Sequence, residues 1–382
     1  MRSIIILYLL FSLGFISCKK NKQVTETIKT PILVDQKIEF ATGFSIQNHK
    51  GYKKINVNAP WPDAKNIFTY ILYPKGSKRP NLTTNANTRF IQIPIDKTVL
   101  TSTTEIPILE YLQLEKKLVG FPNTDYISSE KTRSLVDNGL VKDLGSERSM
   151  NTELVLELSP ELIFGFSATG DTRAYDLIEK TGIPVVMNGS WMEQHPLGRA
   201  EWIKFVAAFF NKEQEASTIF EKIKEDYTKA ALLAKSASQR PTVLAGGMFK
   251  DIWHVPGGES FVARILKDAN TEYLWADTKK TGSIALSFET VLEKAQNAKL
   301  WIGSGSSKSL EELKEKNNRY TFFEAFKNKT VYSSTLKTGA KGGLVYYELG
   351  PMRPDLILKD IIQIAHPELL RDYKPYFFEK LN

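Results

Sequence analysis

Two short stretches of this chain decide its fold: ELVLE at residues 153–157, which leads to LIFGF at 162–166, and ETVLE at 289–293, which leads to LWIGS at 300–304. In each copy, apolar residues three and four positions apart indicate a short amphipathic helix. After a polar break, a short apolar run indicates a buried strand that ends at a loop. Two such α/β units with a long helical stretch between them predict two lobes facing each other, an arrangement suited to closing on a ligand.

The N-terminus predicts export. Arg2 precedes an apolar run over residues 4–16, which is shorter than the ~20 residues of a membrane-spanning helix and typical of a secretory signal peptide at 1–17. FISC at 15–18 is similar to the bacterial lipobox, which makes Cys18 the lipidated first residue of the mature protein. Cys18 is the only cysteine, so the chain can form no internal disulfide, and acylation explains this residue better than chance does.

The residues after Cys18 predict a tether and a location. The polar, lysine-rich stretch at 18–31 reads as a flexible link between a lipid anchor in the membrane and the folded body. Lys19 and Lys20 are not followed by the acidic run of surface-export signals. We therefore expect a membrane-anchored lipoprotein on the periplasmic side.

Composition is that of a globular protein. With 382 residues, 42% hydrophobic and 25% charged, the chain is long enough for two domains of ordinary size. The formal net charge of +8 is compatible with nucleic acid, an anionic membrane surface or an acidic ligand. No basic stripe is interleaved with aromatic residues, and an exported lipoprotein rarely meets nucleic acid, so we expect no nucleic-acid partner.

The predicted fold class is α/β: two Rossmann-like lobes joined by a long helix, with an N-terminal antiparallel β extension. Alternating apolar and polar residues predict the extension, and strands alternating with helices, beginning with a strand at 90–93, predict the lobes. The expected divisions after the tether are the β extension at 32–88, the N-lobe at 89–195, the inter-lobe helices at 196–240 and the C-lobe at 241–382.

Several motifs, taken in order, are similar to those of the substrate-binding lipoproteins of iron-siderophore and cobalamin ABC importers, periplasmic binding proteins whose lobes are joined by one rigid helix. They are LTSTTE (100–105), NTE (151–153), SPEL (159–162), GIPVV (182–186), GGES (257–260), LSFE (286–289) and RP (353–354). HPLGRAEW (195–202) and RPDLILKD (353–360) resemble a branch that carries an N-terminal β extension. The resemblance covers about residues 89–370 and implies a small hinge motion.

The resemblance also implies a ligand cleft between the lobes, lined by loops at the strand ends. Matching those loops nominates Thr103, Tyr126, Arg148 and Ser167 from the N-lobe, Trp191 near the hinge, and Phe249, Trp253, Gly282, Ser283 and Tyr346 from the C-lobe. Aromatic faces suit a flat macrocycle or a catecholate ring, and a cation such as Arg148 suits a negatively charged ferric siderophore. Glu147 aligns with an aromatic residue of the cobalamin-binding relative, which argues against cobalamin.

Two acidic residues are expected to dock the permease. The resemblance places Glu153 and Glu259 at the tops of the two lobes, where family members present carboxylates to arginines of the membrane permease. One charge pair per lobe sets the docking register even though each exposed pair adds little affinity. The alternative is that both are acids near helix starts that complement the helix dipole.

The expected function is non-enzymatic capture. A monomer closes on an iron complex, either a ferric siderophore or haem, and delivers it to the permease dimer of an ABC importer; cobalamin is the alternative cargo. No cofactor is implied, because the metal complex is itself the cargo. The chain has neither HExxH nor GxSxG, and GAKGG at 339–343 lacks the spacing of a phosphate-binding loop, which favours a loop at the cleft rim.

Capture of free zinc or manganese is the other alternative. Such a site needs three or four His, Asp or Glu ligands that converge on the cleft. His195 and His254 supply two of them, and no third histidine lies in a suitable loop.

Overall fold

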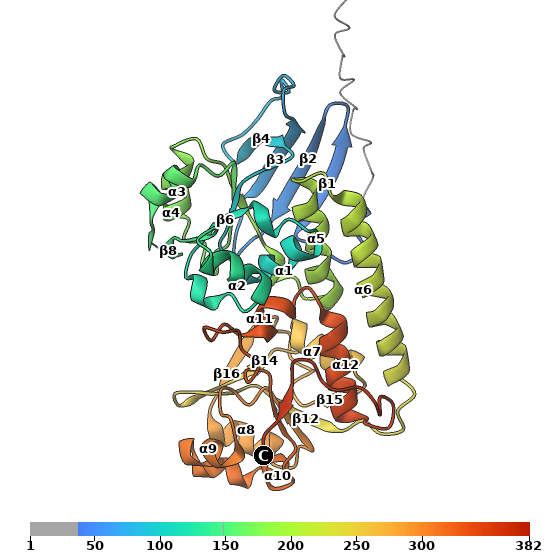
Figure 1. The fold of residues 1–382 in the computed structure, drawn as a ribbon. Coiled ribbons are helices and arrows are strands. Elements are labelled where there is room, and N and C mark those ends of the chain that lie inside the picture. The colour runs from blue at the N-terminus through green and yellow to red at the C-terminus, as the bar shows by residue number, and fades with distance from the viewer. Residues whose placement is uncertain (1–36, 148) are drawn as a thin grey trace, which may run out of the picture. The chain divides into compact units, whose positions relative to one another are not determined.

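The computed structural model describes residues 37–147 and 149–382. The predicted signal peptide, Cys18, the tether and Arg148 lie outside the described residues. The described residues form one compact unit, whose elements are labelled in Figure 1. Within the described ranges, no helix combines the length and the apolar character needed to cross a membrane.

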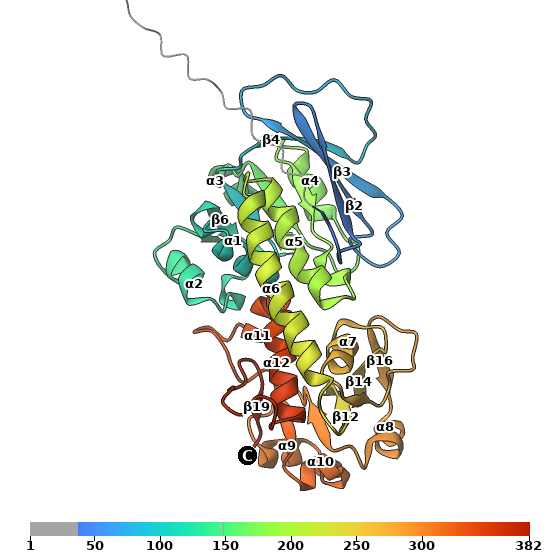
Figure 2. The same ribbon diagram turned by 90° about the vertical axis from the view of Figure 1, so that its right-hand side faces the viewer.

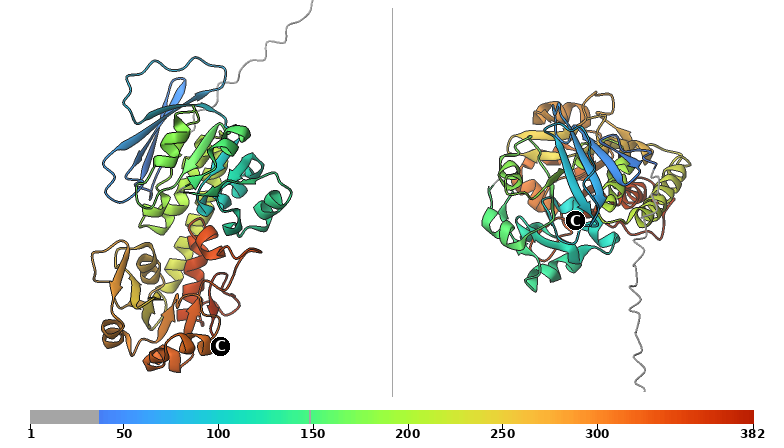
Figure 3. Two further views of the ribbon diagram at one scale, coloured as in Figure 1. Left: turned by 90° about the vertical axis from the view of Figure 1, so that its left-hand side faces the viewer. Right: turned by 90° about the horizontal axis from the view of Figure 1, so that it is seen from above.

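The N-terminal β extension is a four-stranded sheet in the order β1-β2-β3-β4. Its strands are β1 (Phe44–His49), β2 (Tyr52–Asn58), β3 (Ile67–Pro74) and β4 (Thr88–Ile93). The first three pair antiparallel as predicted, but β4 lies parallel to β3 and so belongs to this sheet, not to the N-lobe. The connection at 75–87 is long enough to return the chain to the starting end of β3, which a tight hairpin cannot do. The extension lies beside the N-lobe (Figure 3).

The N-lobe contains a five-stranded parallel sheet in the order β11-β10-β5-β6-β7. Its strands are β5 (Thr98–Leu100), β6 (Leu118–Phe121), β7 (Lys142–Asp143), β10 (Leu162–Gly165) and β11 (Val185–Met187), with a separate hairpin of β8 (Gly145–Ser146) and β9 (Ser149–Met150). Its helices are η1 (Thr103–Glu105), α1 (Ile106–Tyr111), η2 (Glu115–Lys117), η3 (Thr124–Tyr126), α2 (Glu130–Asp137), α3 (Thr152–Leu158), α4 (Arg173–Glu179) and η4 (Ser190–Met192). Helix α1 ends before Gln113, whose positive φ of 59° an α-helix does not allow.

The C-lobe contains a second five-stranded sheet in the order β15-β12-β17-β18-β19, parallel except for β19. Its strands are β12 (Thr242–Ala245), β15 (Glu272–Tyr273), β17 (Leu300–Ile302), β18 (Val331–Ser333) and β19 (Glu379–Lys380), and an antiparallel sheet is formed by β13 (Gly247–Phe249), β14 (Ile252–Pro256) and β16 (Ser283–Leu286). Its helices are α7 (Phe261–Asp268), α8 (Phe288–Ala295), α9 (Leu310–Lys316), η5 (Asn318–Phe322), α10 (Glu324–Lys327), α11 (Val345–Leu349) and α12 (Pro354–Ala365).

Both repeat units take the predicted form. Helix α3 precedes β10, and helix α8 precedes β17. Each helix begins at a side-chain cap: Asn151 accepts the N–H of Leu154 at 3.0 Å, and Ser287 accepts the N–H of Thr290 at 3.1 Å. Both strands lie inside their sheets, which explains why both are wholly apolar.

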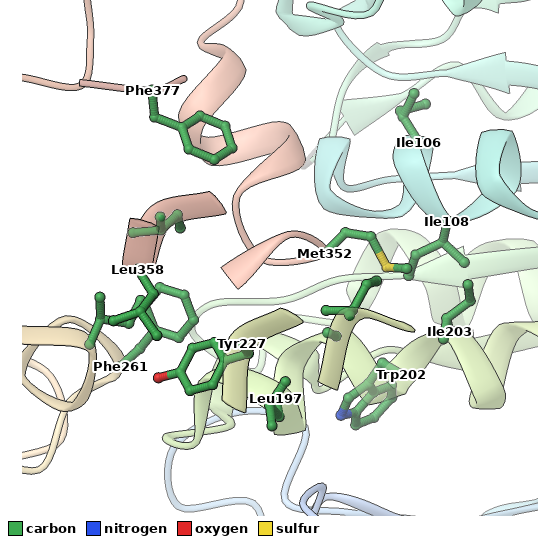
Figure 4. Packing of buried hydrophobic residues seen from close by; sticks show 14 of the residues in the cluster. Ile106, Ile108, Leu197, Trp202, Ile203, Tyr227, Phe261, Met352, Leu358 and Phe377 are labelled. Carbon is green, nitrogen blue, oxygen red and sulfur yellow. The ribbon is translucent and has the colours of Figure 1, made fainter. Parts of the chain in front are cut away.

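Two helices join the lobes. Helix α5 (Pro196–Ala208) and the 22-residue α6 (Glu213–Ala234) pack against each other, and α6 also packs against α12 of the C-lobe (Figure 2). One buried apolar cluster runs through these helices and into both lobes. Within it, Met352 of the C-lobe points toward Ile108 of α1 (Figure 4). A shared core of this kind resists large rotations of one lobe against the other.

The glycine-rich loop at 339–343 lies against the N-lobe. A Cβ atom on Gly339 would lie 2.5 Å from Cα of Ser128, and one on Gly343 would lie 2.1 Å from the carbonyl oxygen of Tyr126. Only glycine therefore permits this approach of the two backbones. In the structure the loop is an inter-lobe contact.

Candidate functional site

A cavity of about 240 Å³ brings together predicted ligand residues of the C-lobe. It is lined by Arg199, Pro256, Ser260, Phe261, Val262, Thr281, Gly282, Ser283, Tyr346, Tyr347, Pro351 and Ile357. Three of these, Gly282, Ser283 and Tyr346, are the residues nominated from the sequence. The start of β16 supplies the first two and α11 supplies the third, while the inter-lobe helix α5 contributes Arg199.

Arg199 is the charged group of this cavity. Its Nε donates to the carbonyl oxygen of Glu193 at 3.0 Å, and its Nη2 donates to that of Trp191 at 2.9 Å. The guanidinium carbon lies 4.2 Å from the centre of the Phe261 ring. Within residues 37–147 and 149–382, no carboxylate forms an ion pair with Arg199. Burial lowers the pKa of Arg199 to about 10, which still leaves it charged at neutral pH.

Arg199 is half-buried, and a partly buried cation without a counter-ion is destabilising, so an anionic ligand removes that cost. Desolvation of a charge costs several kcal/mol unless a partner of opposite charge is present. The cavity also offers two phenols, Tyr346 and the 58%-exposed Tyr347, whose hydroxyl groups have no hydrogen-bond partner in the part of the chain described. Burial raises the pKa of Tyr346, so this phenol is neutral and able to donate. The set of donors therefore suits a ligand with oxygen acceptors and negative charge.

The nominated N-lobe residues within the described part of the chain differ in how far they are exposed. Thr103 is half-buried in η1, which contacts α11 of the cavity. Tyr126 is 63% exposed at the end of η3. Ser167 is buried, and its hydroxyl donates to the carbonyl oxygen of Asp171 and accepts the N–H of Gly170. The hydroxyl of Ser167 therefore stabilises its own turn.

Trp191 lies at the junction of lobe and extension. Its Nε1 donates to the carbonyl oxygen of Pro60 at 3.1 Å, and its ring packs edge-on against Phe166 with centroids 5.9 Å apart. Its own carbonyl oxygen binds Arg199. Trp191 is therefore linked to the cavity through its hydrogen bond with Arg199.

Trp253 requires a correction. Its side chain has no exposed surface and packs among Trp301, Phe288, Tyr320 and Phe323 in the C-lobe core, so it does not line the cleft. Strand β14 buries alternate residues, which turns position 253 inward. The sequence is ambiguous here because the neighbouring Ile252 is apolar as well but exposed.

Phe249 lies on the other strand of the same hairpin. It is 68% exposed, and the ammonium of Lys250 lies 5.6 Å from its ring centre. An exposed aromatic ring at the end of a strand remains available to a ligand, in contrast to Trp253.

Arg199 and Tyr347 were not among the residues nominated from the sequence. Arg199 stands inside HPLGRAEW, a stretch that indicated the branch of the family without assigning a role to its arginine. The signal was an arginine near the start of the predicted inter-lobe helices, with no acidic residue three or four positions away. Tyr347 adjoins the nominated Tyr346 in α11, and both line the cavity.

The two histidines considered for a metal ion lie on different elements. His195 caps helix α5, its Nδ1 accepting the N–H of Leu197 at 3.1 Å. His254 is exposed on β14. In the described parts of the chain, no group of three or more His, Cys, Asp or Glu side chains is placed to hold a metal ion.

The two acids nominated for docking are both exposed. Glu153 lies in the first turn of α3, and Glu259 directly precedes Ser260, the cap of α7. Glu259 lies 3.5 Å from the ammonium of the exposed Lys279. Both positions are compatible with docking to a permease and with a favourable interaction with the helix dipole.

A larger cavity of about 820 Å³ lies between α1, the start of α2, the loop at 337–340 and α11. It is lined by none of the nominated ligand residues. Its charged groups include Glu110 and Glu348, whose carboxylates accept hydrogen bonds from Ser129. We therefore place the candidate site at the smaller cavity.

Comparison with known proteins agrees with this architecture. An uncharacterized lipoprotein of Methanocaldococcus jannaschii is 29% identical over 78% of this chain and 71% of its own length. A periplasmic haem-binding protein of Pseudomonas aeruginosa superposes with a TM-score of 0.56 at 17% identity, over 75% of this chain and 98% of its own. Nickel-bound CeuE of Helicobacter pylori superposes with a TM-score of 0.55 at 22% identity, over 74% of this chain and 88% of its own.

The two structures establish the two-lobed fold with its joining helix. The model of the periplasmic binding protein family matches residues 99–336, more than half of the chain, and leaves the β extension outside. Members of this family are binding components of transport systems and not enzymes. The chain therefore belongs to the periplasmic binding protein family, as its sequence motifs predict.

Proposed function

We propose that this protein captures an anionic iron complex, a ferric siderophore or haem, and delivers it to the permease dimer of an ABC importer. The observation that carries the proposal is Arg199, a cation without a carboxylate partner among the described residues, in a cavity with two phenols. A volume of about 240 Å³ is below that of a site enclosing a drug-sized ligand, so it suits the anionic end of a larger complex.

The comparisons support the class of cargo. One fold neighbour is a haem-binding protein, and another was solved with nickel. The lipoprotein named among the relatives supports an anchor at Cys18, and Glu153 and Glu259 are the proposed contacts to the permease. Nominated aromatic residues with accessible rings, Tyr126 and Phe249, complete the proposed cleft.

The test is a fluorescence and calorimetric titration of the purified protein with ferric siderophores, haem and cobalamin in parallel. Trp191 is the expected reporter, because its carbonyl oxygen binds Arg199. Saturable binding of one iron complex, weakened about tenfold to hundredfold by Arg199→Ala, is the expected result, since a lost charge-assisted hydrogen bond costs about 1.5–3 kcal/mol. Arg173→Ala is the matched control, because Arg173 is exposed and lies outside the cavity.

Other results assign other functions. Saturation by cobalamin alone makes a corrinoid the cargo. A response to zinc or manganese alone, unaffected by Arg199→Ala, overturns the iron-complex proposal in favour of free metal ions.

A further inference from the structure

The turn at 191–193 holds the cavity's arginine. Both hydrogen-bond partners of Arg199 in this turn are backbone carbonyls, those of Trp191 and Glu193, at 2.9 and 3.0 Å. Two N–H groups of a planar guanidinium bound to two carbonyls fix its plane. The direction in which Arg199 presents its remaining N–H groups therefore depends on where this turn lies.

The β extension holds one side chain of the turn. The indole N–H of Trp191 donates to the carbonyl oxygen of Pro60, in the connection between β2 and β3. The backbones also touch here, since a Cβ atom on Gly189 would lie 2.9 Å from Cα of Pro60. Ala59 and Asp63 adopt positive φ values of 43° and 61°, so this connection has a defined, tightly turned backbone.

The extension also holds the acidic side chain of the turn. The carboxylate of Glu193, which is 3% exposed, accepts the N–H of Thr42 at 2.9 Å and that of Gly43 at 2.8 Å. The hydroxyl of Thr42 and the indole N–H of Trp202 donate to the same carboxylate at 3.1 and 3.0 Å. A buried carboxylate with four donors is rigidly held, and loss of its charge leaves donors poorly paired.

We propose that the N-terminal β extension contributes to the ligand site: by binding Trp191 and Glu193, it positions Arg199 for the ligand. This inference rests on the proposed function for its ligand. It assigns a role to residues 42–60, which lie outside the region matched by the family model. Glu193 is a positioning residue that acts through Arg199, and it does not touch the cavity.

The chain contains a matched control for this attachment of the extension to the turn. The carboxylate of Glu201 is also fully buried and accepts the N–H groups of Phe40 and Ala41 at 2.7 and 2.9 Å. Glu201→Gln thus weakens the attachment of the same extension, but Glu201 lies in α5 and makes no contact with the turn's carbonyls. Glu193→Gln weakens the attachment at the turn itself.

The first measurement needs no ligand. Labelling of Arg199 by phenylglyoxal, followed by peptide mass spectrometry of the full protein, reports how firmly the guanidinium is held. We expect Glu193→Gln to accelerate labelling several-fold over both wild type and Glu201→Gln. Equal labelling rates in Glu193→Gln and Glu201→Gln overturn the positioning role, whether or not a ligand has been found.

The second measurement uses the iron complex that wild type binds. We expect Glu193→Gln to raise Kd about tenfold and to have no further effect in an Arg199→Ala background, because coupled residues are non-additive. Glu201→Gln should lower Tm comparably and leave Kd unchanged. Additive effects of Glu193→Gln and Arg199→Ala overturn the proposal, whereas failure of wild type to bind any anionic complex overturns the proposed function and leaves the labelling result to decide the positioning role.

Discussion

The carboxylate of Glu348 in the C-lobe accepts the backbone N–H of Ser128 in the N-lobe at 2.7 Å, across 220 positions of sequence. Its second oxygen accepts the N–H of Ser129 at 2.8 Å, and Ser129 is the cap of helix α2. Only 2% of Glu348 is exposed. Together with the glycine contacts at 339–343, this residue joins the two lobes.

Removal of this carboxylate is expected to destabilise the protein. Glu348→Ala leaves the N–H of buried Ser128 and that of Ser129 without their acceptor, at a cost of about 1–3 kcal/mol per orphaned group. Urea denaturation measures the loss in the free energy of unfolding. Glu130→Ala, at an exposed position nearby, should change it by less than about 0.5 kcal/mol. Equal effects of the two substitutions would contradict the assigned role.

The same residue predicts a pH dependence. Burial raises the pKa of Glu348 from 4.5 to about 7, so the folded protein binds more protons than the unfolded chain between these values. The stability that this raised pKa contributes is complete below about pH 4.5, where the group is protonated in both states. This contribution is lost as the pH rises through 7, with a slope of at most about 1.4 kcal/mol per pH unit. Glu348→Gln cannot ionise, so its stability relative to wild type should rise from pH 4.5 to 7 and then level off. A constant difference across that range would show that the carboxyl does not titrate there.

Gly343→Ala is expected to separate the glycine loop from the N-lobe. The added methyl group would lie 2.1 Å from the carbonyl oxygen of Tyr126, a backbone atom that cannot turn aside. Hydrogen exchange should show faster exchange of the N–H groups of Ser128 and Ser129. Ala340→Ser, at an exposed position of the same loop, is the control and should leave their exchange unchanged. Undisturbed protection in Gly343→Ala would mean that the loop does not contact the N-lobe in solution.

Trp253 should behave as a core residue. Trp253→Ala is expected to cost about 3–5 kcal/mol of stability, because it empties the centre of an aromatic cluster. Trp253→Phe keeps most of the packing and removes an indole N–H that has no partner among the described residues, so it should leave ligand affinity unchanged. Thermal denaturation and calorimetric titration measure both effects. A large loss of affinity in a stably folded Trp253→Phe would return this residue to the ligand site.

Local pattern predicted most of the elements. The helix at 152–158 and the strand at 162–165, like their counterparts at 288–295 and 300–302, follow from the spacing of apolar residues within each segment. The long helix at 213–234 follows in the same way from its buried face. The strand at 88–93 was also recognisable, but its sheet was not, since pairing depends on where a 13-residue connection returns the chain.

The sequence by itself therefore determined the α/β class, the two repeat units, the joining helix and the family. Only the tertiary structure decided which residues share a site. It buried Trp253 in the core, placed Arg199 in a cavity with Tyr346, and tied the turn that holds Arg199 to the β extension. The physical reason is range: periodicity acts over a few neighbouring residues, whereas burial and charge pairing depend on surfaces brought together from distant parts of the chain.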